Sequence, residues 1–267
     1  MAPQPMVLHT ADIAAWVARM WWPVLRIGGF VLTAPIASEA TVPTTVKIVL
    51  TLALALLAAP WAQAPADLSI FSAAGGVAAL QELLIGIAIG TVVQLSFDAV
   101  ELAGQSISMT MGLGFATLVD PVRGANSTVL SQLLVMLATL AYLAVNGHLV
   151  LIGALAKSFH ALPIGASHID GDFFRAVAIW GTQVFESGIL IALPAVIALV
   201  IVNLALGVVT RAAPQLNLFG IGFPITMLAG FFALIAGLDG IMVGISSLIN
   251  NALMAAIDLV STPAGAY

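Results

Sequence analysis

Residues 219–257 read FGIGFPITMLAGFFALIAGLDGIMVGISSLINNALMAAI and contain a single charged residue, Asp239. A helix needs about 20 apolar residues to cross the hydrocarbon core of a bilayer. A second stretch, from Thr128 to Ala156, contains no charged residue. Stretches of this length and composition predict that the chain crosses a membrane several times.

The composition excludes a water-soluble monomer. Of the 267 residues, 61% are hydrophobic and 7% are charged, whereas about 25% are charged in an ordinary soluble domain. The seven Lys and Arg residues are scattered and the net charge is −5, so no basic surface for nucleic acid is expected. The chain has no cysteine and can form neither a disulfide nor a thiolate metal site.

Hydropathy and the positions of glycine and proline predict an all-α protein. Residues 176–210 would extend about 52 Å as one helix, against a hydrocarbon core of about 30 Å, and Pro194 predicts a kink there. Gly237, Asp239 and Gly240 predict a turn that folds the last stretch into a hairpin. The predicted helices are residues 13–36, 46–62, 76–97, 127–156, 176–210 and 217–257. The expected fold is a polytopic integral membrane protein of kinked helical hairpins.

The segment Gly104–Asn126, GQSISMTMGLGFATLVDPVRGAN, is too polar to span a membrane and too apolar for an ordinary linker. Irregular backbone at membrane depth is tolerated where protein or a water-filled cavity surrounds it, which would place this segment at a lumen. A short amphipathic helix on the surface is the alternative. The sequence leaves both interpretations open.

Glu82, Gly86, Gly90 and Gln94 share one helix face at a spacing of four residues. A charged residue at the centre of a spanning helix costs about 2.5–3.5 kcal/mol on the insertion scale, so this face should avoid lipid. One interpretation is proton or ion conduction. Packing against another helix or subunit is favoured instead, because no dense relay of Asp, Glu and His follows, and small residues let helices approach closely.

The sequence lacks the motifs of the commonest catalysts. It has no GxxxxGK[ST], no GxGxxG, no HExxH and no GxSxG nucleophile elbow. His160 and His168 lie near Asp170 and Asp172, but their spacing is more typical of a solvated loop than of a metal site. We expect no enzymatic activity, no cofactor and no metal.

The most specific motif is Asn203–Pro224, NLALGVVTRAAPQLNLFGIGFP. The other distinctive motifs are Arg26–Gly29, Ala34–Pro35, Val42–Pro43, Glu82–Gly90, Ala103–Gln105, Met111–Gly112, Asp120–Pro121, Asn146–His148, Ser158–Phe159 and Ala192–Pro194. In this order they resemble the FliR/SctT family of type III protein-export gates, over residues 20–240. Leu149 departs from the family pattern, in which a second histidine often follows His148. The PQLNLF form is more similar to the flagellar members than to those of virulence systems.

The resemblance implies one FliR-like membrane domain over residues 1–267, with a FliP-like portion at about 16–210 and a FliQ-like C-terminal hairpin at about 211–260. It implies a non-enzymatic subunit in the bacterial inner membrane, at the flagellar basal body, in contact with membrane lipid. FliP and FliQ would join it in the core of the export gate, FlhB and FlhA would lie alongside, and exported flagellar proteins would pass through. The alternatives are the SctT subunit of a virulence system or a proton-coupled secondary transporter.

The resemblance also implies roles for particular residues. Residues 106–124 correspond to a plug inside the channel, and the expected plug residues are Met109, Met111, Gly112, Leu113, Gly114 and Phe115. The expected subunit-packing residues are Glu82, Gly86, Gly90, Arg211, Pro214, Gln215, Asn217 and Phe219.

Overall fold

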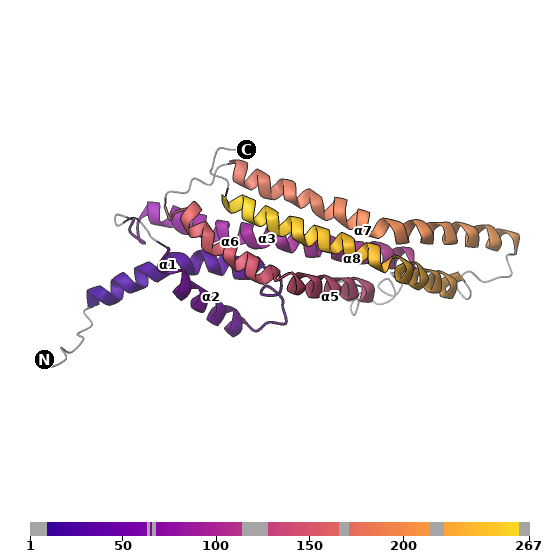
Figure 1. The fold of residues 1–267 in the computed structure, drawn as a ribbon, viewed down its shortest axis with the longest axis horizontal. Coiled ribbons are helices and arrows are strands. Elements are labelled where there is room, and N and C mark those ends of the chain that lie inside the picture. The colour runs from indigo at the N-terminus through magenta and orange to yellow at the C-terminus, as the bar shows by residue number, and fades with distance from the viewer. Residues whose placement is uncertain are drawn as a thin grey trace. The chain divides into compact units, whose positions relative to one another are not determined.

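The computed structural model of the protein describes residues 10–62, 65, 68–113, 128–165, 171–213 and 222–261. Over these ranges the regular elements are helices, and none of them is a strand (Figure 1). They are α1 (Thr10–Thr33), α2 (Thr44–Ala58), α3 (Ala73–Thr110), α5 (Val129–Ala144), α6 (Gly147–Ala161), α7 (Gly171–Ala212) and α8 (Phe223–Ser261). The prediction of an all-α fold is confirmed.

Within the described ranges, three helices are long and apolar enough to cross a membrane, namely α3, α7 and α8, and α5 with α6 adds a fourth span if this bent pair counts as one. The longest, α7, has 42 residues and extends about 63 Å at 1.5 Å per residue. It continues through Pro194 without a break in the helix. The polytopic membrane character predicted from composition is confirmed, and α7 is longer than the predicted segment.

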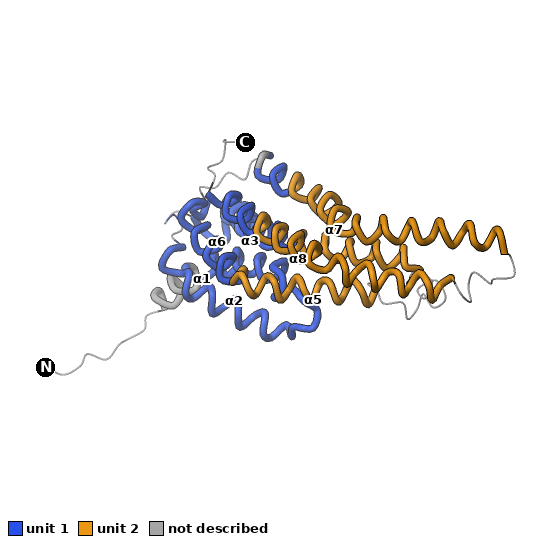
Figure 2. Tube along the Cα trace, turned by 45° about the vertical axis from the view of Figure 1, so that its right-hand side comes forward, with its two compact units in different colours: residues 1–94, 148–177, 253–267 blue, residues 95–147, 178–252 orange. Residues whose placement is uncertain are grey.

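The chain divides into two compact units, which Figure 2 distinguishes by colour. Unit 1 comprises residues 1–94, 148–177 and 253–267, and unit 2 comprises residues 95–147 and 178–252. The core of unit 1 includes the buried side chains of Trp22, Ile27, Ile85, Ile89 and Leu151. The core of unit 2 includes Val100, Ile107, Leu134, Leu199 and Ile245. α3, α7 and α8 each contribute residues to both units.

The predicted helix at residues 127–156 is two helices. α5 begins after Thr128, whose side-chain oxygen accepts a hydrogen bond from the Ser131 amide at 3.2 Å and so caps the helix. It ends before Asn146, which has a positive φ of 54°. Asparagine tolerates this left-handed conformation better than most residues, and α6 starts at the following glycine.

The predicted turn at Gly237–Gly240 is wrong, because α8 runs unbroken from Phe223 to Ser261. An unbroken helix satisfies its own backbone hydrogen bonds, whereas a turn inside an apolar environment would leave some without partners. Within unit 2, α8 packs beside α7 instead of folding back on itself, and a Cβ atom at Gly244 would lie 3.1 Å from Ile191. The division into FliP-like and FliQ-like portions stays a prediction.

Candidate functional site

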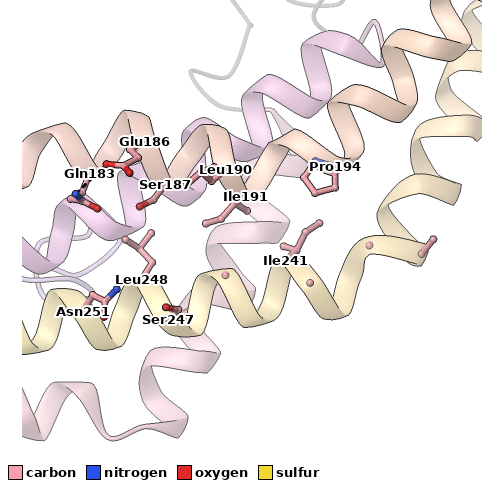
Figure 3. Close-up of a pocket in the computed structure, with 14 residues that line it drawn as sticks. Gln183, Glu186, Ser187, Leu190, Ile191, Pro194, Ile241, Ser247, Leu248 and Asn251 are labelled. Atoms are coloured by element: carbon pink, nitrogen blue, oxygen red, sulfur yellow. Dashed lines mark hydrogen bonds between the residues drawn. The ribbon is translucent and has the colours of Figure 1, made fainter.

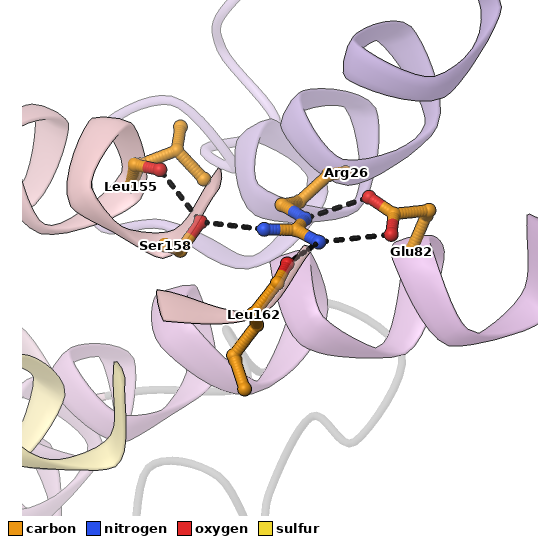
Figure 4. Close-up of polar contacts among 5 residues, drawn as sticks. All are labelled: Arg26, Glu82, Leu155, Ser158 and Leu162. Atoms are coloured by element: carbon orange, nitrogen blue, oxygen red, sulfur yellow. Dashed lines mark hydrogen bonds and ion pairs between the residues drawn. The ribbon is translucent and has the colours of Figure 1, made fainter. Parts of the chain in front are cut away.

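A buried ion pair joins α1 to α3 inside unit 1 (Figure 4). Arg26 Nε donates to Glu82 Oε2 at 2.7 Å, and Arg26 Nη2 donates to Glu82 Oε1 at 2.8 Å. The side chains are 0% and 1% exposed. Two parallel hydrogen bonds between a guanidinium and a carboxylate form the strongest common type of ion pair, and here they hold two apolar helices in register.

The other contacts of the guanidinium come from the C-terminal end of α6. Arg26 Nη1 donates to Ser158 Oγ at 3.0 Å, and Nη2 donates to the Leu162 carbonyl at 2.8 Å. The Phe159 ring lies beneath the guanidinium, with its centroid 4.5 Å from Cζ. A helix C-terminus presents unpaired carbonyls and a partial negative charge, so it favours a cation. Arg26 therefore ties together α1, α3 and α6.

The two hydrogen bonds from Arg26 indicate a structural role for Glu82. Its carboxylate is held by Arg26 at both oxygens, which is the arrangement of a structural ion pair rather than of a group that exchanges protons along a relay. The sequence pattern indicates that Glu82 should avoid lipid, but it does not pair Glu82 with Arg26. Two opposite charges in neighbouring apolar helices are the signal that could have paired them, because a buried charge needs a counter-charge.

The two glycines that follow Glu82 along α3 face α1. A Cβ atom at Gly86 would overlap the Arg26 carbonyl oxygen and lie 2.9 Å from the Phe30 amide nitrogen. At Gly90 a Cβ atom would lie 2.8 Å from the Ala34 amide nitrogen. The backbones of α1 and α3 therefore touch along this seam, and the face of Glu82, Gly86 and Gly90 is occupied within the chain. A role for these residues in contacts with another subunit stays a prediction.

In unit 2, α3 extends through the first residues of the segment Gly104–Asn126, for which the sequence leaves irregular backbone and a short surface helix both open. Gly104 lets α5 approach, since a Cβ atom there would lie 2.5 Å from Ser131 Cα. The hydroxyls of Ser106 and Thr110 donate to carbonyls four residues back, each at 2.8 Å. Ser108 Oγ lies 2.8 Å from Thr128 Oγ1. The polar side chains thus find partners without interrupting the helix, so α3 continues to Thr110 rather than ending at the predicted residue 97. Residues 114–126 of the segment lie outside the described residues.

α3 ends in a Schellman motif at Gly112. This residue has a φ of 85°, its amide donates to the Met109 carbonyl at 3.0 Å, and the Leu113 amide donates to the Ser108 carbonyl at 3.0 Å. These are the paired hydrogen bonds that define the motif, and glycine is the residue that adopts the left-handed conformation without strain.

Side chains from α7 and α8 donate hydrogen bonds to the last carbonyls of α3. Asn203 Nδ2 donates to the Thr110 carbonyl at 3.2 Å, and Thr226 Oγ1 donates to the Met111 carbonyl at 3.3 Å. The Met111 side chain is fully buried and lies against Gly230, where a Cβ atom would be 2.5 Å from Met111 Cγ. Every carbonyl from Ser108 to Met111 therefore has a donor, and this end of the helix is firmly held.

The predicted plug residues divide into two groups. Met111 and Gly112 belong to the anchored end of α3, whereas the Met109 side chain is 67% exposed and Leu113 is half-buried. Gly114 and Phe115 lie outside the described residues. The role of these residues as a plug stays a prediction.

The chain matches the family described as bacterial export proteins, family 1, over residues 17–252. It belongs to this family. The match includes both the Arg26–Glu82 pair and the anchored end of α3. The predicted resemblance to the FliR/SctT family is thereby confirmed.

Relatives in this export family are similar over most of their length. The flagellar biosynthetic protein FliR of Escherichia coli is 43% identical over 216 residues, which cover 81% of this chain and 82% of that protein. FliR of Pectobacterium carotovorum is 41% identical over 86% of this chain and 87% of its own length. FliR of Bacillus subtilis is 30% identical over 82% of this chain and 85% of its own length.

Of the remaining predicted contact residues of this export-family chain, only Arg211 is among the described residues. Arg211 is exposed in the last turn of α7, where a cation complements the helix dipole. Pro214, Gln215, Asn217 and Phe219 lie outside the described residues. Among the residues that are described, His, Asp and Glu form no group of three that could hold a metal ion.

Proposed function

We propose that this protein is a structural subunit of the flagellar protein-export apparatus in the bacterial inner membrane. The observation that carries the proposal is its 43% identity to E. coli FliR over most of both chains. The apolar helices and the structural ion pair fit a protein that shapes a path across the membrane rather than one that performs a reaction.

The finer proposal is that the chain forms the core of the export channel with FliP and FliQ, next to FlhB and FlhA. The exposed surfaces of α7 and α8 support it. Only 22% of the most apolar window of each helix is buried within the chain, and the exposed side chains include Phe185, Ile201, Leu204, Phe232 and Ile235. Surfaces of this kind require either lipid or neighbouring helices to cover them.

Residues 109–115 are proposed to close the channel at rest. Their apolar side chains can exclude water from a narrow lumen, and hydrophobic constrictions close pores by dewetting. The anchored end of α3 supports this role, because hydrogen bonds from Asn203 and Thr226 would fix the N-terminal end of a closing segment.

Complementation tests the proposed function. The full chain is expressed in an E. coli strain that lacks its own FliR, and swimming in soft agar is measured together with the recovery of FliP and FliQ on the tagged chain. We expect motility and co-purification to return. A folded, membrane-inserted chain that recovers neither FliP nor FliQ and restores no motility would contradict the proposal. Restored secretion in a virulence-system mutant without restored motility would favour the SctT role.

A further inference from the structure

A groove of about 530 Å³ runs between α7 and α8 within unit 2. From α7 it is lined by residues 183, 186, 187, 190, 191 and 194, and from α8 by residues 236, 237, 240, 241, 244, 247, 248 and 251. Along each helix most of these positions are three or four residues apart, so one continuous face of α7 and one of α8 line the groove.

The groove has a polar end (Figure 3). Glu186 lies there with Gln183 and, across from them on α8, Ser247 and Asn251. The one contact of the Glu186 carboxylate within the described chain is a long hydrogen bond of 3.4 Å from Gln183 Nε2. Among the described residues that line the groove, none is Lys or Arg. A carboxylate in an apolar helix therefore faces the groove without a counter-charge.

The opposite end of the groove is apolar, and on α8 it is lined partly by glycines. Gly237 and Gly240 have no atom within 4 Å of the position that a Cβ would take, so another backbone could approach α8 closely there. On α7, Pro194 has no N–H, so the Leu190 carbonyl lacks its usual helical donor. Leu190 and Pro194 both line the groove. The groove thus offers close approach together with a surplus of hydrogen-bond acceptors.

We propose that a membrane helix of another subunit of the export apparatus docks in this groove and places a Lys or Arg side chain against Glu186. A basic residue supplies the counter-charge that Glu186 lacks, and its donors add to the one long hydrogen bond from Gln183. Lipid tails fit the groove less well, because hydrocarbon offers neither a counter-charge to the Glu186 carboxylate nor hydrogen bonds to the polar end of the groove. The inference rests on the proposed function, since it takes the partner from the same apparatus.

A neutral substitution at Glu186 tests whether its negative charge holds the docked helix. Glu186→Gln keeps the size of the side chain, and Asp239→Asn is the matched control, because Asp239 is an exposed carboxylate in α8 that does not line the groove. We expect Glu186→Gln to reduce the recovery of the docked subunit at least about tenfold, as expected for loss of one side of a buried charge pair. Asp239→Asn should leave recovery unchanged. Equal recovery for wild type and Glu186→Gln would overturn the proposal.

Cross-linking in the otherwise unmodified chain identifies the occupant and does not depend on a folded Glu186 variant. The chain has no cysteine, so Ser247→Cys carries a single photoactivatable label within the groove. We expect the labelled complex to yield a peptide from a membrane helix of another subunit that contains Lys or Arg. Exchange of that residue for Glu should then rescue Glu186→Lys.

Cross-links to lipid alone, or to this chain alone, would overturn the docking proposal. The two proposals fail in different ways. A wild-type chain that recovers no other subunit would overturn the proposed function and the groove inference together. A wild-type chain that recovers its partners while Ser247→Cys labels none of them would overturn the groove inference and leave the proposed function standing.

Discussion

Arg26 and Glu82 stabilise the fold only as a pair. Each is almost fully buried, and a buried charge without its partner is far less stable than a buried apolar side chain. The sequence indicates that Glu82 should avoid lipid, and its need for a counter-charge narrows the choice to the few basic residues, but no local pattern selects Arg26, because the two residues are 56 positions apart. Ser158 and the Leu162 carbonyl are more distant still. Long-range partners of this kind depend on the packing of helices rather than on a local pattern.

Removal of either partner should destabilise the protein more than removal of both. Glu82→Ala and Arg26→Ala each leave an uncompensated charge and should lower the free energy of unfolding by about 3–5 kcal/mol. Arg26→Met with Glu82→Leu should recover a large part of that loss. Chemical unfolding of the purified chain in detergent measures these differences. Single variants as stable as the wild type would show that the pair does not hold α1 to α3.

The glycines of α3 should differ sharply in their tolerance of alanine. Gly86→Ala forces a Cβ atom onto the backbone of α1, and overpacking typically costs about 1–3 kcal/mol. Gly76 lies in the same helix with no atom within 4 Å of its Cβ position, so Gly76→Ala should be neutral or stabilise the helix by up to about 1 kcal/mol. The midpoint of thermal unfolding compares the two. Equal shifts would contradict close packing at Gly86.

At the scale of helices, apolar length predicts which segments are helical but not where they end. The sequence predicts helices in each region where the structure has one, yet it misses the break at Asn146 and adds a turn at Gly237–Gly240. Glycine is ambiguous, because the same residue can end a helix, as at Gly112, or let two helices touch, as at Gly104. Neighbouring helices decide between these uses, and the local sequence does not show the neighbours.

The end of α3 should loosen when Gly112 is replaced. Its φ of 85° is unfavourable for a residue with a Cβ, at a cost of roughly 1–2 kcal/mol, so Gly112→Val should speed hydrogen exchange at the amides of residues 111–113. Gly112→Asn is the control, because asparagine also occurs at this position of the motif. Exchange rates that do not distinguish Val from Asn would argue against the Schellman motif.

At the scale of the whole molecule, both units depend on the same three long helices, α3, α7 and α8. Much of the surface of α7 and α8 is left uncovered by the chain itself. Lipid or neighbouring helices must therefore cover these surfaces, and the composition alone already indicates that need.

Deletion of residues 109–115 tests the proposed plug in the complete apparatus. The assembled gate should then leak, because no apolar constriction excludes water, and uptake of a small impermeant dye should rise. Phe71→Ala is a control for general disturbance, since the Phe71 side chain is 98% exposed outside α3. A deleted gate that assembles and remains as tight as the intact one would show that the segment is not a plug.

Because Arg26 is far from its partners along the chain, the ribosome makes these residues at different times. At about 5–20 residues per second, Glu82 is made roughly 3–11 s after Arg26, because 56 positions separate them. Ser158 is 132 positions from Arg26 and follows it by roughly 7–26 s. Until Glu82 arrives, α1 carries a cation that disfavours its entry into the bilayer. α1 can therefore complete its buried contact with α3 only after Glu82 has been made.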